Sequence, residues 1–169
     1  MSYTVLISLG SNKGNRQENI QKAIALIKDH LGTLIAVSPI YETPSWGYED
    51  VPYLNNAICL STKIQPLELM LSLLKIEEQL GRKRSSNNSY EARCIDLDII
   101  LIEGLIIDHP KLQVPHPRMH LRKFVLQPLV DIAGTWLHET QHVSLSDLLN
   151  KCEDESQIKK YGEVSLYSN

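Results

Sequence analysis

Two aspartates that stand one residue apart, Asp96 and Asp98, are the residues of this sequence best suited to chemistry. They precede the apolar run 99–102, which is typical of a buried strand entered near Cys94. Successive side chains of a strand leave opposite faces, so both carboxylates point to one face while Leu97 points into the core. Neighbouring carboxylates repel each other unless a cation joins them, and hard oxygen ligands favour Mg²⁺ or Mn²⁺ over zinc.

A basic loop leads into this strand. Segment 82–93 contains Arg82, Lys83, Arg84 and Arg93 but only one acidic residue, Glu91. A polyphosphate is the natural partner of such a loop beside a metal-binding pair, so we interpret segment 82–98 as a metal–nucleotide site. The alternative is a pair of solvated aspartates at a strand end.

Three further positions are candidates for ligand contact. Tyr53 and Asn55 alternate onto one face of a predicted strand, where an aromatic ring and an amide suit a flat heterocycle; a surface Tyr and a turn Asn are the alternative. The loop 42–52 is long and contains aromatic residues that could cover a ligand. His116 stands between prolines as a possible neighbour of a phosphate or a metal, whereas Glu77, on an apolar helix stripe, is expected to be solvated at the helix edge.

Composition sets the broad class. The 169 residues fit a single domain, 1–169, with a core in 3–150 and a polar tail, 153–169, expected to be poorly ordered. The net charge of −3 argues against a general binder of nucleic acid or of membrane surfaces. Basic residues instead gather in segments 82–93 and 111–123, which predicts two local patches for anions.

The expected location is the cytosol. The N-terminus leads directly into a strand without the pattern of a secretory signal, and no apolar run approaches the roughly 20 residues that span a bilayer. The three cysteines are too few and too scattered for a disulfide framework or a zinc site.

The elements that must position these residues follow from hydrophobic spacing and turn signals. In order they are a strand at 3–9, a helix at 15–31, a strand at 33–41, a strand at 54–63, a helix at 66–80 and a strand at 94–102. This β-α-β-β-α-β order is the split, ferredoxin-like pattern, an α+β fold with a mainly antiparallel sheet and helices on one face. Its first and third strands lie centrally, and ligands are expected on the open sheet face and the loops at one end.

The remaining sequence predicts a C-terminal hairpin and a helical extension. A short strand is expected near 105–107, and the apolar stretch 125–133 is expected to be helical after Pro128. A short helix at 143–151 would close the core.

Several motifs in order now resemble the 6-hydroxymethyl-7,8-dihydropterin pyrophosphokinase family of folate biosynthesis. They are Gly10-Ser11-Asn12, Thr43-Pro44, Tyr53-Leu54-Asn55, Gly81-Arg82, Arg93-x-x-Asp96-Leu97-Asp98, Val114-Pro115-His116-Pro117-Arg118 and Arg122-x-Phe124-Val125-Leu126-x-Pro128-Leu129. The resemblance covers about residues 3–150. It implies a monomeric enzyme that transfers the pyrophosphate of ATP to the pterin hydroxymethyl group and leaves AMP.

The resemblance also assigns roles residue by residue. The catalytic residues implied are Arg82, Arg93, Asp96 and Asp98, with Asp96 and Asp98 as ligands of two Mg²⁺ ions that accompany ATP. The pterin site implied comprises Thr43, Pro44, Trp46, Tyr53, Asn55 and Phe124. The nucleotide site implied comprises Glu77, Arg84, Ile99, Lys111, His116, Arg118 and Arg122. Leu74, Tyr90 and Leu121 depart from the family pattern.

Two other classes of function share parts of this pattern. A nucleotidyl transferase can use an Asp-x-Asp pair, but it would release pyrophosphate rather than AMP. Ferredoxin-like RNA-binding modules stack bases on aromatics of the central strands, and here only Tyr53 stands near such a position.

Overall fold

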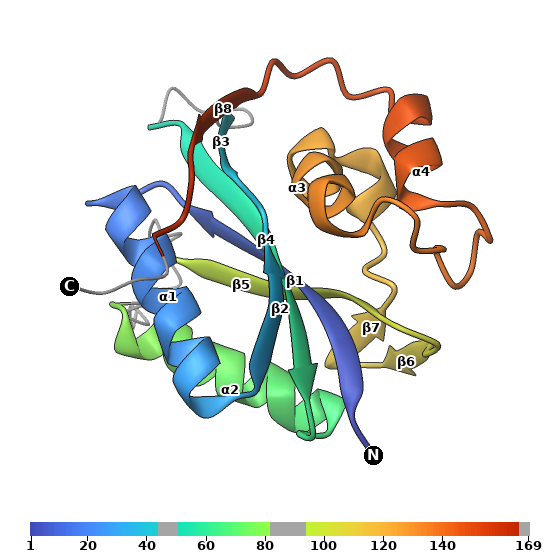
Figure 1. Ribbon diagram of the computed structural model, residues 1–169, viewed down its shortest axis with the longest axis horizontal. Coiled ribbons are helices and arrows are strands. Elements are labelled where there is room, and N and C mark those ends of the chain that lie inside the picture. The colour runs from blue at the N-terminus through green and yellow to red at the C-terminus, as the bar shows by residue number, and fades with distance from the viewer. Residues whose placement is uncertain (44–50, 82–93, 166–169) are drawn as a thin grey trace.

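The computed structural model of the chain describes residues 1–43, 51–81 and 94–165. Within these ranges the main sheet has six strands in the order β5-β1-β4-β3-β8, with β2 also paired to β4 (Figure 1). The strands are β1 (Tyr3–Ser11), β2 (Thr33–Val37), β3 (Ile40–Thr43), β4 (Tyr53–Thr62), β5 (Asp96–Ile102), β6 (Ile107–His109), β7 (Leu112–Val114) and β8 (Lys159–Gly162). The helices are α1 (Arg16–His30), α2 (Pro66–Gln79), α3 (Lys123–Ala133) and α4 (Leu145–Lys151), with a 3₁₀ turn at Met119–Leu121.

The two central strands, β1 and β4, pair antiparallel along their whole length, from Tyr3 opposite Thr62 to Ser11 opposite Leu54. β5 lies antiparallel on the other side of β1, and β2 and β3 lie antiparallel on the other side of β4. This is the order predicted from the β-α-β-β-α-β pattern. The α+β fold with a mainly antiparallel sheet is confirmed, and β6 and β7 form the separate hairpin expected near residue 107.

The single strand predicted at 33–41 is divided into β2 and β3. Pro39 lies at the break and has no N–H to donate. Ser38 supplies the local hydrogen bonds instead: its N–H donates to the Ala57 carbonyl at 2.9 Å, and its Oγ accepts from the Ala57 N–H at 2.8 Å. Pro39 therefore interrupts the strand while both halves stay on β4.

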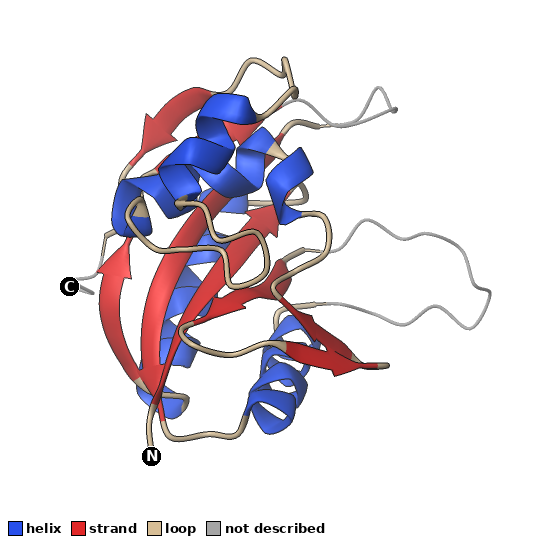
Figure 2. Cartoon of the chain, turned by 90° about the vertical axis from the view of Figure 1, so that its right-hand side faces the viewer, coloured by secondary structure: helices blue, strands red, loops and turns tan. Residues whose placement is uncertain are grey.

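The two helices of the β-α-β-β-α-β core, α1 and α2, pack on one face of the sheet as predicted, and the C-terminal extension adds α3 and α4 on the other face. Alternate residues of β1 (Val5, Ile7 and Leu9) pack in one core with α1 and α2. Leu6, on the opposite face, packs in a second core with α3 and α4. Figure 2 shows the β6–β7 hairpin beside the sheet, next to α2. Among the described residues, α3 and α4 therefore occupy part of the sheet face that was expected to be open to a ligand.

Two further predictions about the second half of the chain need correction. α3 begins at Lys123 and contains Pro128, although Pro128 was expected to precede the helix. The buried stripe Val125, Leu126 and Leu129 explains the difference, because burying these side chains offsets the hydrogen bond that an interior proline removes.

The polar tail is the second correction. It was expected to be poorly ordered, but β8 pairs antiparallel with β3, with Lys160 opposite Tyr41. Backbone hydrogen bonds to a strand edge do not require apolar side chains, so composition did not reveal this strand. Within the described ranges, no helix combines the length and the apolar character that a membrane crossing requires.

Candidate functional site

A row of residues crosses the second sheet face at the end where β5 begins. Asp96 lies opposite Gly10, Gly10 opposite Asn55, and Asn55 opposite Tyr41. Directly paired residues share a face, so these four positions, which we call the site row, form a strip across β5, β1, β4 and β3. Ala57, two residues along β4, already packs in the core beneath α3. The site row therefore lies at the uncovered margin of this face.

The two aspartates lie as the sequence predicted. Leu97 is buried in the first core, whereas Asp96 is half-buried and Asp98 is exposed, so the strand alternation is confirmed. The strand begins at Asp96 rather than near Cys94. The Cys94 carbonyl is held before it, accepting from Ser11 Oγ at 2.5 Å and from Asn19 Nδ2 at 3.2 Å. These bonds fix the entry into β5 against β1 and α1.

On the far side of the site row, Asn55 is buried and its amide is fixed. Asn55 Nδ2 donates to Thr43 Oγ1 at 2.8 Å. The Asn55 Oδ1 lies over Gly10, where an added Cβ would come within 2.9 Å of it. Tyr53 pairs with Thr43 and precedes Asn55 on the same face of β4. An oriented amide, a hydroxyl and an aromatic ring thus gather at this end of the row.

Gly10 is a site residue that sequence reasoning missed. The predicted strand ends at residue 9, but Gly10 lies inside β1, between Asp96 and Asn55. Its backbone φ is not in the left-handed region, so glycine is needed here because a side chain would have no room beside Asn55. A glycine that directly follows an alternating apolar strand was the available signal.

The start of α3 brings Arg122 and Phe124 toward the same face. Phe124 is half-buried and packs against the second core. The Arg122 guanidinium carbon lies 5.8 Å from the centre of the Phe124 ring, within the range of a cation–π contact. Because α3 packs on β4, an aromatic residue of the helix and Tyr53 of the strand belong to contacting elements.

A groove of about 570 Å³ lies on the other side of β5, between α2, β5 and the β6–β7 hairpin. Five residues with expected roles line it: Glu77, Asp98, Ile99, Lys111 and His116. Leu74, one of the departures from the family pattern, lines it too. Asp98 is thus shared between the groove and the face that bears the site row.

Glu77 corrects the expectation of a solvated helix edge. Its side chain is 3% exposed, and Glu77 Oε1 accepts a hydrogen bond from the Leu97 N–H at 2.8 Å. Leu97 belongs to the edge strand β5, whose outward amides need partners. The carboxylate therefore ties α2 to β5 at the wall of the groove.

His116 is held in one tautomer beside two arginines. Its backbone N–H donates to the Ile100 carbonyl at 2.8 Å, and its ring Nδ1 accepts from the Arg118 backbone N–H at 3.2 Å. Burial, with smaller contributions from the Arg122 and Arg118 charges, lowers the pKa of His116 below its ordinary 6.5. The imidazole is accordingly neutral near pH 7, with its proton on Nε2 available to donate.

The structure brings together the predicted site residues that belong to β3, β4, β5, the start of α3 and the groove. Five of the predicted positions lie outside the described residues: Pro44, Trp46, Arg82, Arg84 and Arg93. Arg118 is exposed and does not line the groove, although its backbone N–H contacts His116.

The donor set suits a magnesium ion that shares its coordination with phosphate. The residues that the structure describes contain no cluster of three His, Cys, Asp or Glu side chains able to hold a metal. A pair of carboxylates with further ligands from substrate and water is the arrangement in which proteins usually hold Mg²⁺. Asp96 and Asp98 fit this requirement, because they share one face of one strand end.

Comparison with known proteins shows consistent similarity to one family. The family model of 7,8-dihydro-6-hydroxymethylpterin-pyrophosphokinase matches residues 6–134. The 2-amino-4-hydroxy-6-hydroxymethyldihydropteridine pyrophosphokinase of Porphyromonas gingivalis is 39% identical over 79% of this chain and 92% of its own length. The enzyme of the same name from Bacillus subtilis is 42% identical over 78% of this chain and 79% of its own length.

Solved structures agree in fold. The HPPK-DHPS of Plasmodium falciparum, in its A437G form with SDX-DHP, aligns over 89% of this chain with a TM-score of 0.73 and 17% sequence identity. The alignment covers 45% of that longer chain, so it compares one part of it with the fold described here.

Proposed function

The chain belongs to the 7,8-dihydro-6-hydroxymethylpterin-pyrophosphokinase family, and on this premise we propose that the site row and the neighbouring groove are its two substrate sites. The enzyme transfers the pyrophosphate group of ATP to 6-hydroxymethyl-7,8-dihydropterin, giving the pterin diphosphate and AMP in folate biosynthesis. One observation supports the placement above the others: Asp96 belongs to the site row, and Asp98 lines the groove. The acceptor hydroxyl and the nucleotide phosphates would meet at this strand end.

The pterin would bind at the end of the site row formed by β3 and β4. Thr43 and Asn55 would read the hydrogen-bonding edge of the ring, since their side chains are already oriented toward each other. Tyr53 and Phe124 would stack on its two faces. Pro44 and Trp46, which lie outside the described residues, would complete this site, as the family resemblance implies.

The nucleotide would bind in the groove. Leu97 turns its N–H outward to Glu77, and in an antiparallel edge strand every second residue is oriented alike, so Ile99 presents its backbone outward as well. A backbone N–H and C=O in one plane can pair with the edge of an adenine base. Lys111 and His116, on the hairpin side, would contact the phosphates.

Asp96 and Asp98 would hold two Mg²⁺ ions together with ATP. Bound Mg²⁺ supplies charge neutralisation on the phosphates and a lower pKa for the hydroxyl that attacks. The protein's own contribution is position: β5 fixes both carboxylates, and Asn55 with Thr43 fixes the acceptor. Arg122, with Arg82, Arg84, Arg93 and Arg118 as predicted from the sequence, would stabilise charge on the transferred and leaving phosphates.

Product analysis tests the proposal. Purified protein is mixed with ATP, Mg²⁺ and 6-hydroxymethyl-7,8-dihydropterin, and nucleotides are separated over time. AMP that forms only when pterin is present is the expected result. ADP would mean that a single phosphoryl group is transferred, and free pyrophosphate would mean a nucleotidyl transferase. The same assay with Asp96→Ala tests the site, because unchanged turnover would contradict the metal assignment.

The oligomeric state and the cellular location are predictions from the sequence alone. We propose a monomer in the cytosol that binds neither nucleic acid nor membrane. Sedimentation of the purified protein tests the first, cell fractionation the second, and filter binding with RNA and flotation with vesicles the third.

A further inference from the structure

The segment after α4 contacts both sides of the proposed pterin site. We call residues 152–165 the C-terminal strap; they follow residue 134, where the match to the family model ends. Figure 1 shows this segment passing from α4 over the end of α3 to β8, beside β3. We propose that the strap is a positioning device, which holds the start of α3 and the β3–β4 strands at the separation that the pterin requires. The proposal rests on the pterin site proposed above.

The first tether is Asp154. The N-cap residue of α3, Arg122, makes no side-chain capping bond. The strap supplies one instead, since Asp154 Oδ2 accepts from the Lys123 N–H at 3.0 Å. Asp154 Oδ1 accepts from the Ser156 N–H at 2.9 Å and from Ser156 Oγ at 2.5 Å, which orients the carboxylate. A carboxylate at a helix N-terminus stabilises the first turn, and here that turn contains Phe124.

The second tether is β8. It extends the sheet beyond β3, with Lys159 opposite Glu42 and Lys160 opposite Tyr41. The ring of Tyr161 lies 5.7 Å from the Arg16 guanidinium carbon. Backbone pairing with β3 thus fixes the strap to the strand that ends in Thr43, and the Tyr161 ring stacks on Arg16 of α1.

Arg16 transmits this contact to β4. Its Nη1 donates to Glu42 Oε2 at 3.0 Å and to the Pro52 carbonyl at 2.7 Å. Glu42 directly precedes Thr43, and Pro52 directly precedes Tyr53. A single guanidinium, stacked on the strap, therefore contacts the Glu42 side chain next to Thr43 and the Pro52 backbone next to Tyr53.

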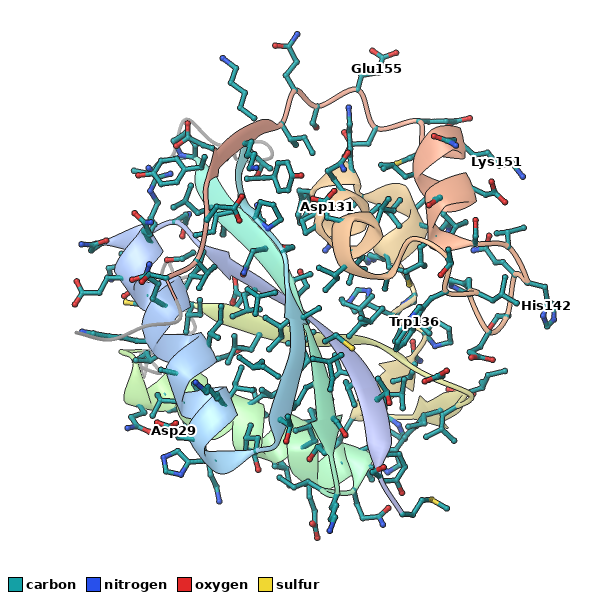
Figure 3. The ribbon with its side chains drawn as sticks, in the orientation of Figure 1. Asp29, Asp131, Trp136, His142, Lys151 and Glu155 are labelled. Atoms are coloured by element: carbon teal, nitrogen blue, oxygen red, sulfur yellow. The ribbon has the colours of Figure 1, made fainter. Side chains whose placement is uncertain are left out.

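A third contact joins the two sides of the site without the strap. The Tyr41 hydroxyl, in the site row, donates to the Asp131 carboxylate of α3. Figure 3 shows Asp131 on α3, with Glu155 of the strap pointing outward above it. The strap adds tethers at the ends of the elements, where Phe124 and Thr43 lie. Holding both sides in place before binding reduces the ordering cost of capturing the pterin.

Nucleotide binding in the groove serves as the internal control for pterin binding. It is lined by α2, β5 and the hairpin, and none of its lining residues belongs to the strap. A loss of strap contacts should therefore weaken pterin binding while nucleotide binding is retained. A loss of general stability would affect both.

The experiment measures the dissociation constants of 6-hydroxymethylpterin and of a non-hydrolysable ATP analogue, together with both KM values, in five strap variants and in Tyr53→Ala. Asp154→Ala removes the cap, Asp154→Asn keeps an oxygen acceptor, and Glu155→Ala removes the same charge one residue away, where the side chain is exposed. Tyr161→Ala removes the ring and Tyr161→Phe keeps it.

We expect Asp154→Ala and Tyr161→Ala to raise the pterin dissociation constant and KM about five- to tenfold, the scale of a lost helix cap. Tyr161→Phe and Glu155→Ala should stay near wild type, and nucleotide affinity should be retained throughout. Asp154→Asn should lie between wild type and Asp154→Ala, because it keeps one of the two oxygen acceptors. Tyr161→Ala keeps the test decisive if Asp154→Ala fails to fold.

Two results would overturn the proposal. One is a pterin affinity for Asp154→Ala and Tyr161→Ala equal to that of Glu155→Ala. Another is an equal loss of pterin and nucleotide affinity. Tyr53→Ala separates the premises: if it leaves pterin affinity unchanged, the pterin site itself is wrong. If Tyr53→Ala weakens binding and the strap variants do not, only the strap's role is wrong.

Discussion

At the scale of single residues, the paired carboxylates of β5 make the most direct prediction. Asp96 lies at the strand end, half-buried and beside Gly10, so its removal leaves the two cores untouched. We expect Asp96→Ala to lower kcat by about a thousandfold or more, because it would remove one of the two proposed ligands of Mg²⁺, an ion that stabilises the transition state by several kcal/mol. Steady-state kinetics checks this. Asp29→Ala, at the exposed end of α1 in Figure 3, is the control and should be fully active.

A second prediction concerns the close approach of Asn55 to Gly10. A Cβ at this position would lie 2.9 Å from Asn55 Oδ1, and that amide is held by Thr43. Gly10→Ala should displace Asn55 and raise the KM for pterin about tenfold, with a smaller effect on the KM for ATP. Gly162→Ala, where an added Cβ meets nothing within 4 Å, is the matched control. Equal kinetic constants in the two variants would contradict the assignment of Asn55 to the pterin.

His116 makes a prediction about pH. Burial lowers its pKa below 6.5, so the unfolded chain binds more protons than the folded one in the interval between the two values. The free energy of unfolding should therefore fall as the pH drops through and below 6.5. His116→Asn, which keeps an acceptor for the Arg118 N–H, should flatten that dependence in urea unfolding. His138, whose pKa burial also lowers, remains in the variant and accounts for the residual slope.

Some properties of these single residues could be predicted from the sequence, and others could not. The common face of Asp96 and Asp98 was predictable because the two-residue period of a strand is set by the backbone alone. The burial of Glu77 was not, because it depends on an amide of β5 that is twenty residues away in sequence. An apolar stripe reveals which side of a helix faces the core, but it does not reveal which polar group of another element lies opposite that side.

At the scale of elements, local signals predicted the helices better than the strand boundaries. Asn15, the first residue of the helix predicted at 15–31, caps α1: its Oδ1 accepts from the Glu18 N–H at 3.1 Å. The start of α3 was missed because its cap, Asp154, lies far along the chain. β8 was missed for a related reason: its partner is the free edge of β3, which only the assembled sheet creates.

The break between β2 and β3 makes a prediction at this scale. Ser38 is buried, and its Oγ is the acceptor for the Ala57 N–H of the central strand. Ser38→Ala leaves that buried amide without this acceptor, and we expect a loss of about 1–3 kcal/mol in the free energy of unfolding. Ser72→Ala on α2, whose hydroxyl only donates to the Glu68 carbonyl, should change stability little. Urea unfolding of both variants measures the difference.

At the scale of the whole molecule, charge is distributed unevenly along the chain. The net charge is −3, yet the basic segment 111–123 contributes Lys111 and His116 to one wall of the groove. ATP is a polyanion and the pterin is neutral, so long-range attraction acts on only one of the two substrates. The two KM values should therefore respond differently to salt.

We expect the KM for ATP to rise severalfold when ionic strength increases from about 0.05 M to about 0.5 M, as screening shortens the reach of the basic groups, while the KM for pterin stays nearly constant. Lys111→Ala should start from a higher KM for ATP and show a shallower salt dependence, because it removes a charge from the groove. Lys28→Ala, exposed near the end of α1, removes the same charge elsewhere and should keep the wild-type dependence. If the two KM values rise in parallel, or if both lysine variants behave alike, the groove is not where the phosphates bind.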